Sequence, residues 1–291
     1  MSGINRREFL GGAPLAAAAG FHLGPAATGG TKAGGMRIGF VTYLWGKDMD
    51  LPTLIDACER SGLLGVELRT EHAHGVEPSL SKAERREVRR RFEQSPVTLV
   101  GYGSNAQFHD NDPARLKHNI ELTKQYIQLM HDCGGTGVKV KPNGFVKGVP
   151  HQKTIEQIGK ALNEVGAYGA KYGQRIRLEV HGRGTSELPV IKAIMDVADN
   201  RNVGVCWNSN DSDLNGRGLE YNFNLVKSRL GDTAHVRELN TGDYPYAELF
   251  KLFQQAGWRG WVLLEARTNP PDKVQAMTEQ RKVFERLVGR A

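Results

Sequence analysis

The sequence predicts an α/β protein, a single (β/α)8 TIM barrel preceded by an N-terminal leader. Two observations lead to this fold. From Met36 onward, short apolar strands alternate with amphipathic helical stretches, and eight such units can be assigned. This part of the chain is also about 250 residues long, the usual length of the fold. We therefore divide the chain into a leader over residues 1–35 and one barrel domain over residues 36–291.

The first 35 residues have the features of a secretory leader. Arg6 and Arg7 precede an apolar stretch, Phe9 to Leu23, which is too short and too rich in Gly to span a membrane. The paired arginines followed by Glu-Phe-Leu resemble the twin-arginine export signal, whose pathway carries folded proteins. We expect export to the periplasm and no stable membrane insertion.

Composition excludes several other classes of protein. Hydrophobic residues make up 39% and charged residues 24% of the chain, so wholesale disorder is excluded. The net charge of +7 fits a solvated surface as readily as an anionic ligand. Three scattered cysteines, Cys58, Cys133 and Cys206, exclude a disulfide framework and are expected to be buried.

Eight strands are assigned in chain order from their apolar character. They are Arg37–Tyr43, Gly65–Arg69, Val97–Gly103, Gly137–Lys141, Ile176–His181, Val203–Asn208, Ala234–Leu239 and Gly260–Ala266. The clearest helix runs from Pro113 to Met130, with Asp112 as its N-cap, and the last runs from about Asp272 to Leu287. A doubly wound open sheet is the alternative, but the first strand is not followed by the Gly-rich turn that such a sheet normally has.

The strand ends carry an unusual density of charged and polar side chains. In a (β/α)8 barrel the C-terminal strand ends converge on the active site, and alternate residues face inward. The candidates are Glu67, Arg69, Lys139, Lys141, Glu179, His181, Asn208, His235, Arg237, Glu265 and Arg267. Because burying an unpaired charge is costly, we expect these groups to be paired or to bind a metal.

Four of these residues can enclose a divalent cation. Glu179, Asn208, His235 and Glu265 would supply three oxygen ligands and one nitrogen ligand. Mixed carboxylate and imidazole ligands favour Mn, Mg, Co or Zn over a thiolate-bound metal. The four residues lie far apart in the sequence, so their convergence depends on the barrel.

Three strand segments resemble those of xylose-isomerase-like TIM-barrel proteins, the sugar phosphate isomerase and epimerase group. They are residues 177–182, 235–239 and 261–266, and the resemblance covers nearly the whole chain after the leader. It implies that Glu179, His235 and Glu265 bind the divalent metal of that family. Asn208 departs from the family, which usually has Asp there, so metal affinity should fall.

The resemblance also implies a reaction and a substrate class. It assigns proton transfer to Glu179 and Glu265, which remove and return a proton beside the carbonyl of a sugar through an enediolate. The partner is then a small-molecule carbohydrate. The loop residues Asp211 and Asp213 are alternatives for the missing fourth carboxylate.

We expect five residues to contact the substrate: His181, Arg237, Lys141, His109 and Trp45. His181 and Arg237 lie one pleat beyond Glu179 and His235, where they can contact sugar oxygens or, for Arg237, brace Glu179. Lys141 can bind an anionic group or pair with a carboxylate. Trp45 can stack on a sugar ring, with core packing as the alternative.

The leading hypothesis is a divalent-metal-dependent sugar isomerase or epimerase. The alternatives are a lyase that cleaves a keto-glycoside by beta-elimination with the same metal and base, and a non-catalytic sugar-binding barrel, which Asn208 would favour. The basic run from Lys82 to Arg91 is interleaved with Glu84 and Glu87. That pattern is typical of a solvated helix face, so no nucleic-acid partner is expected. A homo-oligomer is compatible with the sequence.

Overall fold

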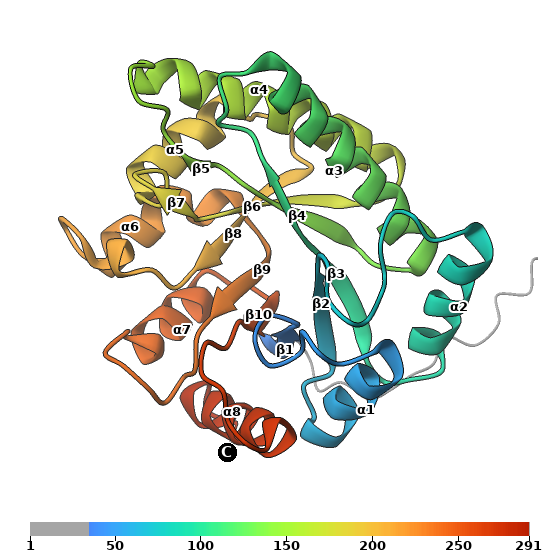
Figure 1. The fold of residues 1–291 in the computed structure, drawn as a ribbon. Coiled ribbons are helices and arrows are strands. Elements are labelled where there is room, and N and C mark those ends of the chain that lie inside the picture. The colour runs from blue at the N-terminus through green and yellow to red at the C-terminus, as the bar shows by residue number, and fades with distance from the viewer. Residues whose placement is uncertain (1–34, 291) are drawn as a thin grey trace, which may run out of the picture. The chain divides into compact units, whose positions relative to one another are not determined.

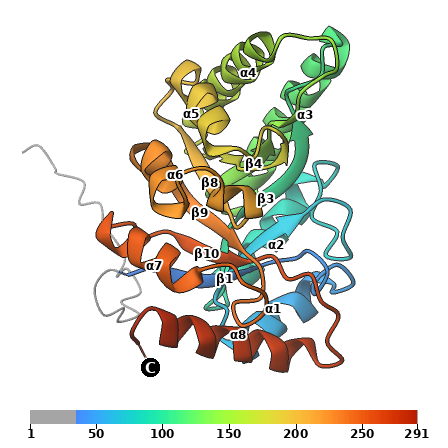
Figure 2. The ribbon, with the colours of Figure 1, turned by 90° about the vertical axis from the view of Figure 1, so that its left-hand side faces the viewer.

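The computed structural model describes residues 35–290. The leader predicted over residues 1–35, with its paired arginines, therefore lies outside the described residues except for its last one. The described chain forms a closed barrel of eight parallel strands with helices packed around it (Figures 1 and 2). This confirms the predicted (β/α)8 fold. None of the described helices combines the length and the apolarity needed to cross a membrane.

Each barrel strand is followed by a helix in the order that the sequence predicted. The strands are β1 (Arg37–Val41), β2 (Gly65–Arg69), β3 (Thr98–Gln107), β4 (Gly137–Lys141), β6 (Arg175–Glu179), β8 (Val203–Asn208), β9 (Leu230–Val236) and β10 (Trp261–Leu264). The helices are α1 (Leu51–Ser61), α2 (Lys82–Glu93), α3 (Pro113–Cys133), α4 (His151–Lys171), α5 (Leu188–Val197), α6 (Leu219–Val226), α7 (Tyr246–Gln255) and α8 (Lys273–Leu287). Around the barrel the strands follow the order β1-β10-β9-β8-β6-β4-β3-β2.

Several predicted strand bounds were wrong by a few residues. β10 ends at Leu264 because its ladder ends there, where Leu264 pairs with Phe40 of β1 and Val236 of β9. A short pair outside the barrel, β5 (Asn143–Gly144) and β7 (Gly182–Arg183), was not predicted. Gly182 is needed there because its φ is +97° and a Cβ would lie 2.5 Å from the backbone of Asn143.

Four of the eight helices that follow barrel strands, α1, α2, α3 and α8, begin with a side-chain cap. The Asp112 side chain accepts a hydrogen bond from the Ala114 amide, and Pro113 is the first residue of α3, as predicted. The side chain of Asp272 accepts from the amide of Gln275 at the start of α8. These caps fix where the loops that lead into the capped helices return to the outer layer.

The hydrophobic core has two layers. The larger layer lies between the strands and the helices, and a small cluster of Val41, Val100, Trp261 and Leu263 fills the barrel interior. All three cysteines are buried and free, as expected.

An ion pair between a buried arginine and a partly exposed aspartate lies at the N-terminal end of the barrel strands. The fully buried Arg177 donates from Nε to Asp232 Oδ1 at 2.9 Å. Its guanidinium fits against Gly101 and Gly137, where a Cβ would lie only 2.2 and 3.0 Å from its atoms. Arg177 therefore fills the barrel interior at this end, and the polar groups discussed below lie at the opposite, C-terminal end of the strands.

The basic run on α2 is paired along its own helix. Arg89 contacts Glu93 at 2.8 Å, and Arg90 and Arg91 contact Glu87 at 2.7 and 2.9 Å. These contacts fit the solvated face that the sequence indicates.

Candidate metal centre

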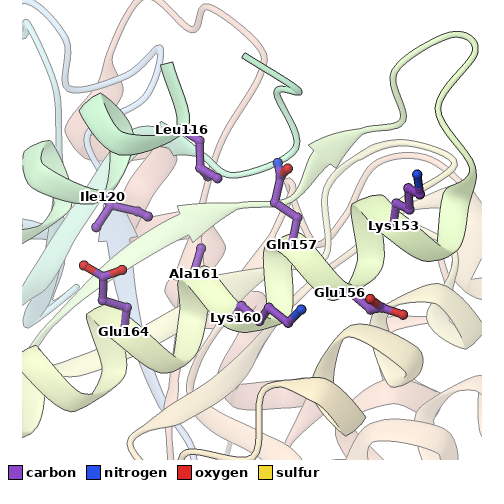
Figure 3. A pocket seen from close by; sticks show the side chains of 8 residues that line it. All are labelled: Leu116, Ile120, Lys153, Glu156, Gln157, Lys160, Ala161 and Glu164. Atoms are coloured by element: carbon purple, nitrogen blue, oxygen red, sulfur yellow. The ribbon is translucent and has the colours of Figure 1, made fainter. Parts of the chain in front are cut away.

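A cavity of about 400 Å3 opens at the C-terminal ends of the barrel strands. Its lining residues come from almost every strand end and from the loops that follow them. They are Tyr43, Arg69, Lys141, Glu179, His181, Gly182, Ser186, Asn208, Asn210, Arg237, Glu265 and Arg267. A separate surface groove of about 350 Å3 lies on the outer layer between α3 and α4 (Figure 3) and is lined by no strand-end residue. The strand-end cavity is therefore the candidate site.

Three buried side chains converge at the base of this cavity. Glu179, His235 and Glu265 each offer one ligand atom, and these atoms all lie within 4.8 Å of one another. His235 Nδ1 is 3.5 Å from Glu179 Oε1 and 3.9 Å from Glu265 Oε2. The three residues come from β6, β9 and the end of β10, where inward-facing positions of a barrel meet.

The carboxylate oxygens that face away from His235 are already paired. Lys139 donates to Glu179 Oε2 at 2.6 Å, and both side chains are buried. Arg69 donates to Glu265 Oε1 at 3.0 Å. Each cation therefore holds one oxygen of its carboxylate and turns the other toward His235.

A further carboxylate orients the imidazole. Glu67 is fully buried, and its Oε1 lies 3.1 Å from His235 Nε2. This contact places a proton on Nε2, so Nδ1 is the nitrogen at which a second proton or a metal binds. Nδ1 is buried and has no hydrogen-bond partner among the described residues. An unpartnered imidazole nitrogen facing two carboxylate oxygens is the arrangement that a divalent cation completes.

The charges at this centre influence one another. Burial would raise the pKa of Glu179, but Lys139 and His235 hold it well below the usual range, so the carboxylate is ionised. Burial would lower the pKa of His235, but Cys206 and the carboxylates raise it well above its usual value. Protons and a divalent cation therefore compete for this imidazole, and a cation would displace the Nδ1 proton.

Asn208 lies beside the three ligands. It is 4% exposed, and its amide Nδ2 donates to Glu179 Oε1 at 3.2 Å. The amide thus takes up a carboxylate oxygen instead of adding a charge to the centre. Rotation of the amide by half a turn would present its oxygen to the same space.

The two loop aspartates do not join this cluster. Asp211 is 95% exposed in its side chain and lies 3.7 Å from Arg237. Asp213 is buried and accepts hydrogen bonds from Tyr244 Oη at 2.7 Å and from the Asn210 amide at 3.0 Å. Neither aspartate takes the place of the family's fourth carboxylate in this structure, because both carboxylates point to other partners.

Burial raises the pKa of Asp213 to about 8, in spite of the Tyr244 hydrogen bond, which lowers it. Because this value lies above that of the unfolded chain, the protonated carboxyl stabilises the fold at low pH, and this contribution is lost as pH rises toward 8. Asn at position 213 stays uncharged at every pH. We therefore expect the free energy of unfolding of Asp213→Asn, relative to that of wild type, to increase by about 1–3 kcal/mol as the pH rises from about 5 to about 9. Urea titrations at each pH measure this difference. Asp211→Asn is the exposed control, and a pH-independent difference for Asp213→Asn would contradict the assignment.

The rim of the cavity is rich in groups that can bind a sugar. His181 Nδ1 is buried and has no hydrogen-bond partner within residues 35–290, and burial lowers the pKa of this imidazole, which keeps it neutral. Burial and the nearby Lys139 lower the pKa of Lys141 to about 8, and its ammonium donates to Asn105 Oδ1 at 3.1 Å. Arg237 has a buried Nε without a partner among the described residues. Its closest carboxylate is Asp211, so it does not brace Glu179, a role that Lys139 fills.

Two of the predicted substrate contacts do not line the cavity. Trp45 is 2% exposed, packs in the core and donates from its indole to the Thr268 carbonyl at 2.9 Å. His109 lies in the loop after β3, with Phe108 fully buried beside it. Both residues follow a strand, where the alternation of facing no longer determines side-chain direction.

Glu67, Arg69 and Lys139 were placed at strand ends from the sequence, and pairing with Glu179 or Glu67 was one of the two alternatives for Lys139, but the roles of Glu67 and Arg69 were missed. Glu67 orients His235, while Arg69 and Lys139 each hold a ligand carboxylate. The sequence does place these three side chains inside the barrel, because on each strand they alternate with another charged residue or with Gly on the same face. The sequence does not show which partner each side chain contacts, because these contacts join residues 40 to 196 positions apart.

Comparison with known proteins agrees with this architecture. A family model described as "Xylose isomerase-like TIM barrel" matches residues 55–287. No curated protein sequence matches the chain significantly.

Solved structures share the fold at low identity. A 3-keto-D-glucoside 4-epimerase from E. coli has a TM-score of 0.73 at 13% identity, covering 86% of this chain and 99% of the other. A D-psicose 3-epimerase from Clostridium cellulolyticum H10, crystallised with D-tagatose, has a TM-score of 0.74 at 15% identity, and the match covers 87% of this chain and 99% of the other. The IOLI protein with a bound zinc atom has a TM-score of 0.74 at 15% identity, and the match covers 87% of this chain and 98% of the other.

Proposed function

The chain belongs to the xylose isomerase-like TIM-barrel family, and we propose that it is a divalent-metal-dependent isomerase or epimerase of a keto sugar. One observation carries this proposal. His235 Nδ1, which has no hydrogen-bond partner among the described residues, faces one oxygen each of Glu179 and Glu265 at the base of a polar, cation-rimmed cavity. The epimerases of similar fold support the substrate class.

Glu179, His235 and Glu265 would hold the metal, with Asn208 as a fourth group through its amide oxygen. Carboxylate and imidazole donors suit Mn, Mg, Co or Zn, and the zinc in a protein of similar fold is consistent with that set. When bound, a divalent cation supplies a Lewis acid that lowers the barrier to removing a proton beside a carbonyl.

The chain's own residues perform the proton transfers. Glu179 and Glu265 stand on β6 and just beyond β10, with β8 and β9 between them in the barrel. One carboxylate removes the proton from the carbon beside the carbonyl and the other returns a proton, so the configuration at that carbon can change. Lys139 keeps Glu179 ionised, and Arg69 fixes the orientation of Glu265.

The rim residues orient the substrate. His181, Lys141 and Arg237 line the cavity and none of them pairs with a ligand carboxylate, so they can hydrogen-bond to sugar oxygens. Fixing the sugar in this way places its reacting carbon between the two carboxylates.

The function is tested with a panel of free keto sugars and keto-glucosides followed by proton NMR. We expect a new stereoisomer or aldose–ketose isomer with Mn-loaded protein and none after removal of metal with EDTA. Products lacking the glycosidic substituent would instead identify the lyase, and absence of both metal binding and product would identify a non-catalytic barrel.

Asn208→Asp is expected to tighten metal binding by about 1–3 kcal/mol, because it adds a negative charge next to the ligand atoms at an intermediate effective dielectric. Calorimetric titration of Mn into the metal-free protein measures the change. Asn210→Asp, on the same cavity wall, serves as the matched control. Equal affinities for wild type and Asn208→Asp would place residue 208 outside the metal's ligands.

We also propose export to the periplasm through Arg6 and Arg7. Changing both arginines to Lys preserves charge but removes the paired guanidinium groups of the signal. Cell fractionation should then find the protein retained in the cytoplasm. Undiminished periplasmic protein would contradict the export proposal without affecting the assignment of the barrel.

A further inference from the structure

A second cavity, of about 570 Å3, adjoins the candidate site. Arg237 and Arg267 line both cavities, so the two share a wall. The second cavity is formed by the short helix after β8 (Asp211–Leu214), the loop after β9 and the loop after β10. A molecule bound in the first cavity and a group bound in the second would therefore lie beside the same two arginines.

Most polar groups of the second cavity are already bonded within the protein. Tyr244 Oη donates to Asp213, and Tyr246 Oη accepts from the Arg237 amide at 2.9 Å. Glu238 Oε1 accepts from the amides of Arg267 and Thr268 at 3.0 and 2.8 Å. A ligand here would therefore gain more from apolar contact than from new hydrogen bonds.

An apolar surface is left facing this space. Leu214 is 40% exposed and is one of only two large hydrophobic side chains classed as exposed in residues 35–290. It lines the cavity together with Tyr244. Asp211, Glu238 and Asp243 outnumber Arg237 and Arg267 among the residues that line this cavity, so it disfavours an anionic group.

We propose that the second cavity binds the neutral aromatic aglycone of a glycoside whose sugar ring occupies the candidate site. This inference rests on the proposed function and narrows its substrate class from keto sugars in general to keto-glycosides. The aglycone ring would pack against Leu214 and the ring of Tyr244, while the sugar lies on the far side of Arg237.

The test compares methyl and phenyl 3-keto-β-D-glucosides, which differ only in the aglycone. Solvent-deuterium exchange beside the carbonyl, catalysed by the Mn-loaded full-length protein, gives kcat/KM for each. We expect wild type to favour the phenyl compound about tenfold, the effect of burying one side of a phenyl ring. Leu214→Ala should lower this preference toward onefold and leave kcat/KM for the methyl compound unchanged.

Two further variants make the result specific. Thr241→Trp fills the second cavity from its own wall and should also abolish the preference, again with the methyl compound unaffected. Leu64→Ala removes the other exposed leucine, which precedes β2 at the opposite end of the barrel, and should keep the preference. Equal kcat/KM for both compounds in wild type would overturn the second-cavity assignment alone. Exchange with a free keto sugar but with neither glucoside would overturn this inference alone, whereas exchange with none of these compounds would overturn the proposed function as well.

Discussion

Replacing either Glu179 or Glu265 by Gln is expected to lower turnover of the keto sugar by at least about 10²-fold, because each change removes a proton-transfer group. Gln preserves the volume and one oxygen ligand but cannot accept the proton. It also removes a negative charge that faces His235, so Mn affinity should fall as well. Steady-state kinetics at saturating Mn separate the two effects, since only the loss of metal affinity is restored by excess metal.

Two comparisons sharpen this result. Glu248→Gln, on the exposed face of α7, should leave both turnover and Mn affinity unchanged. His235→Ala should act through metal occupancy and recover part of its activity in excess Mn. Full activity in both Gln variants would contradict the two-carboxylate mechanism and leave the cluster as a binding site only.

Lys139→Met is expected to destabilise the metal-free protein by about 3–5 kcal/mol, because Glu179 would be left as a buried carboxylate without its ammonium partner. The same change should raise Mn affinity by about tenfold to hundredfold, since a cation beside the binding site is removed. Mn should therefore restore much of the lost stability. Urea unfolding with and without Mn, together with calorimetry, measures both quantities.

Lys141→Met is the matched control, because Lys141 lies on the same strand and face but contacts Asn105 instead of a carboxylate. It should change stability and Mn affinity much less. Lys139 is expected to neutralise the Glu179 carboxylate in the metal-free protein. A Lys139→Met variant that is as stable as wild type without metal, or that binds Mn more weakly, would contradict this role.

The sequence was sufficient to predict the fold and the groups at the barrel mouth. Period-two alternation placed Glu179, His235 and Glu265 on inward-facing positions, and barrel closure brings such positions together. Both rules are local or follow from the fold class, so they need no knowledge of individual contacts.

Contacts across the barrel could not be predicted in the same way. His235 and Glu67 are separated by 168 residues, and only the closed sheet shows that they meet. Loop side chains were harder still, because Trp45 turns its indole toward Thr268 and not into the cavity. Outside a strand, side-chain direction depends on the particular path of the backbone.

The central claim is that a divalent metal held by Glu179, His235 and Glu265 makes a proton beside a carbonyl removable. Its most direct test is proton NMR of a keto sugar that the protein turns over, incubated in deuterium oxide with Mn-loaded or EDTA-treated protein. We expect deuterium at the carbon beside the carbonyl with Mn-loaded protein and none after EDTA treatment. Turnover without deuterium incorporation, or equal incorporation after complete removal of metal, would contradict it.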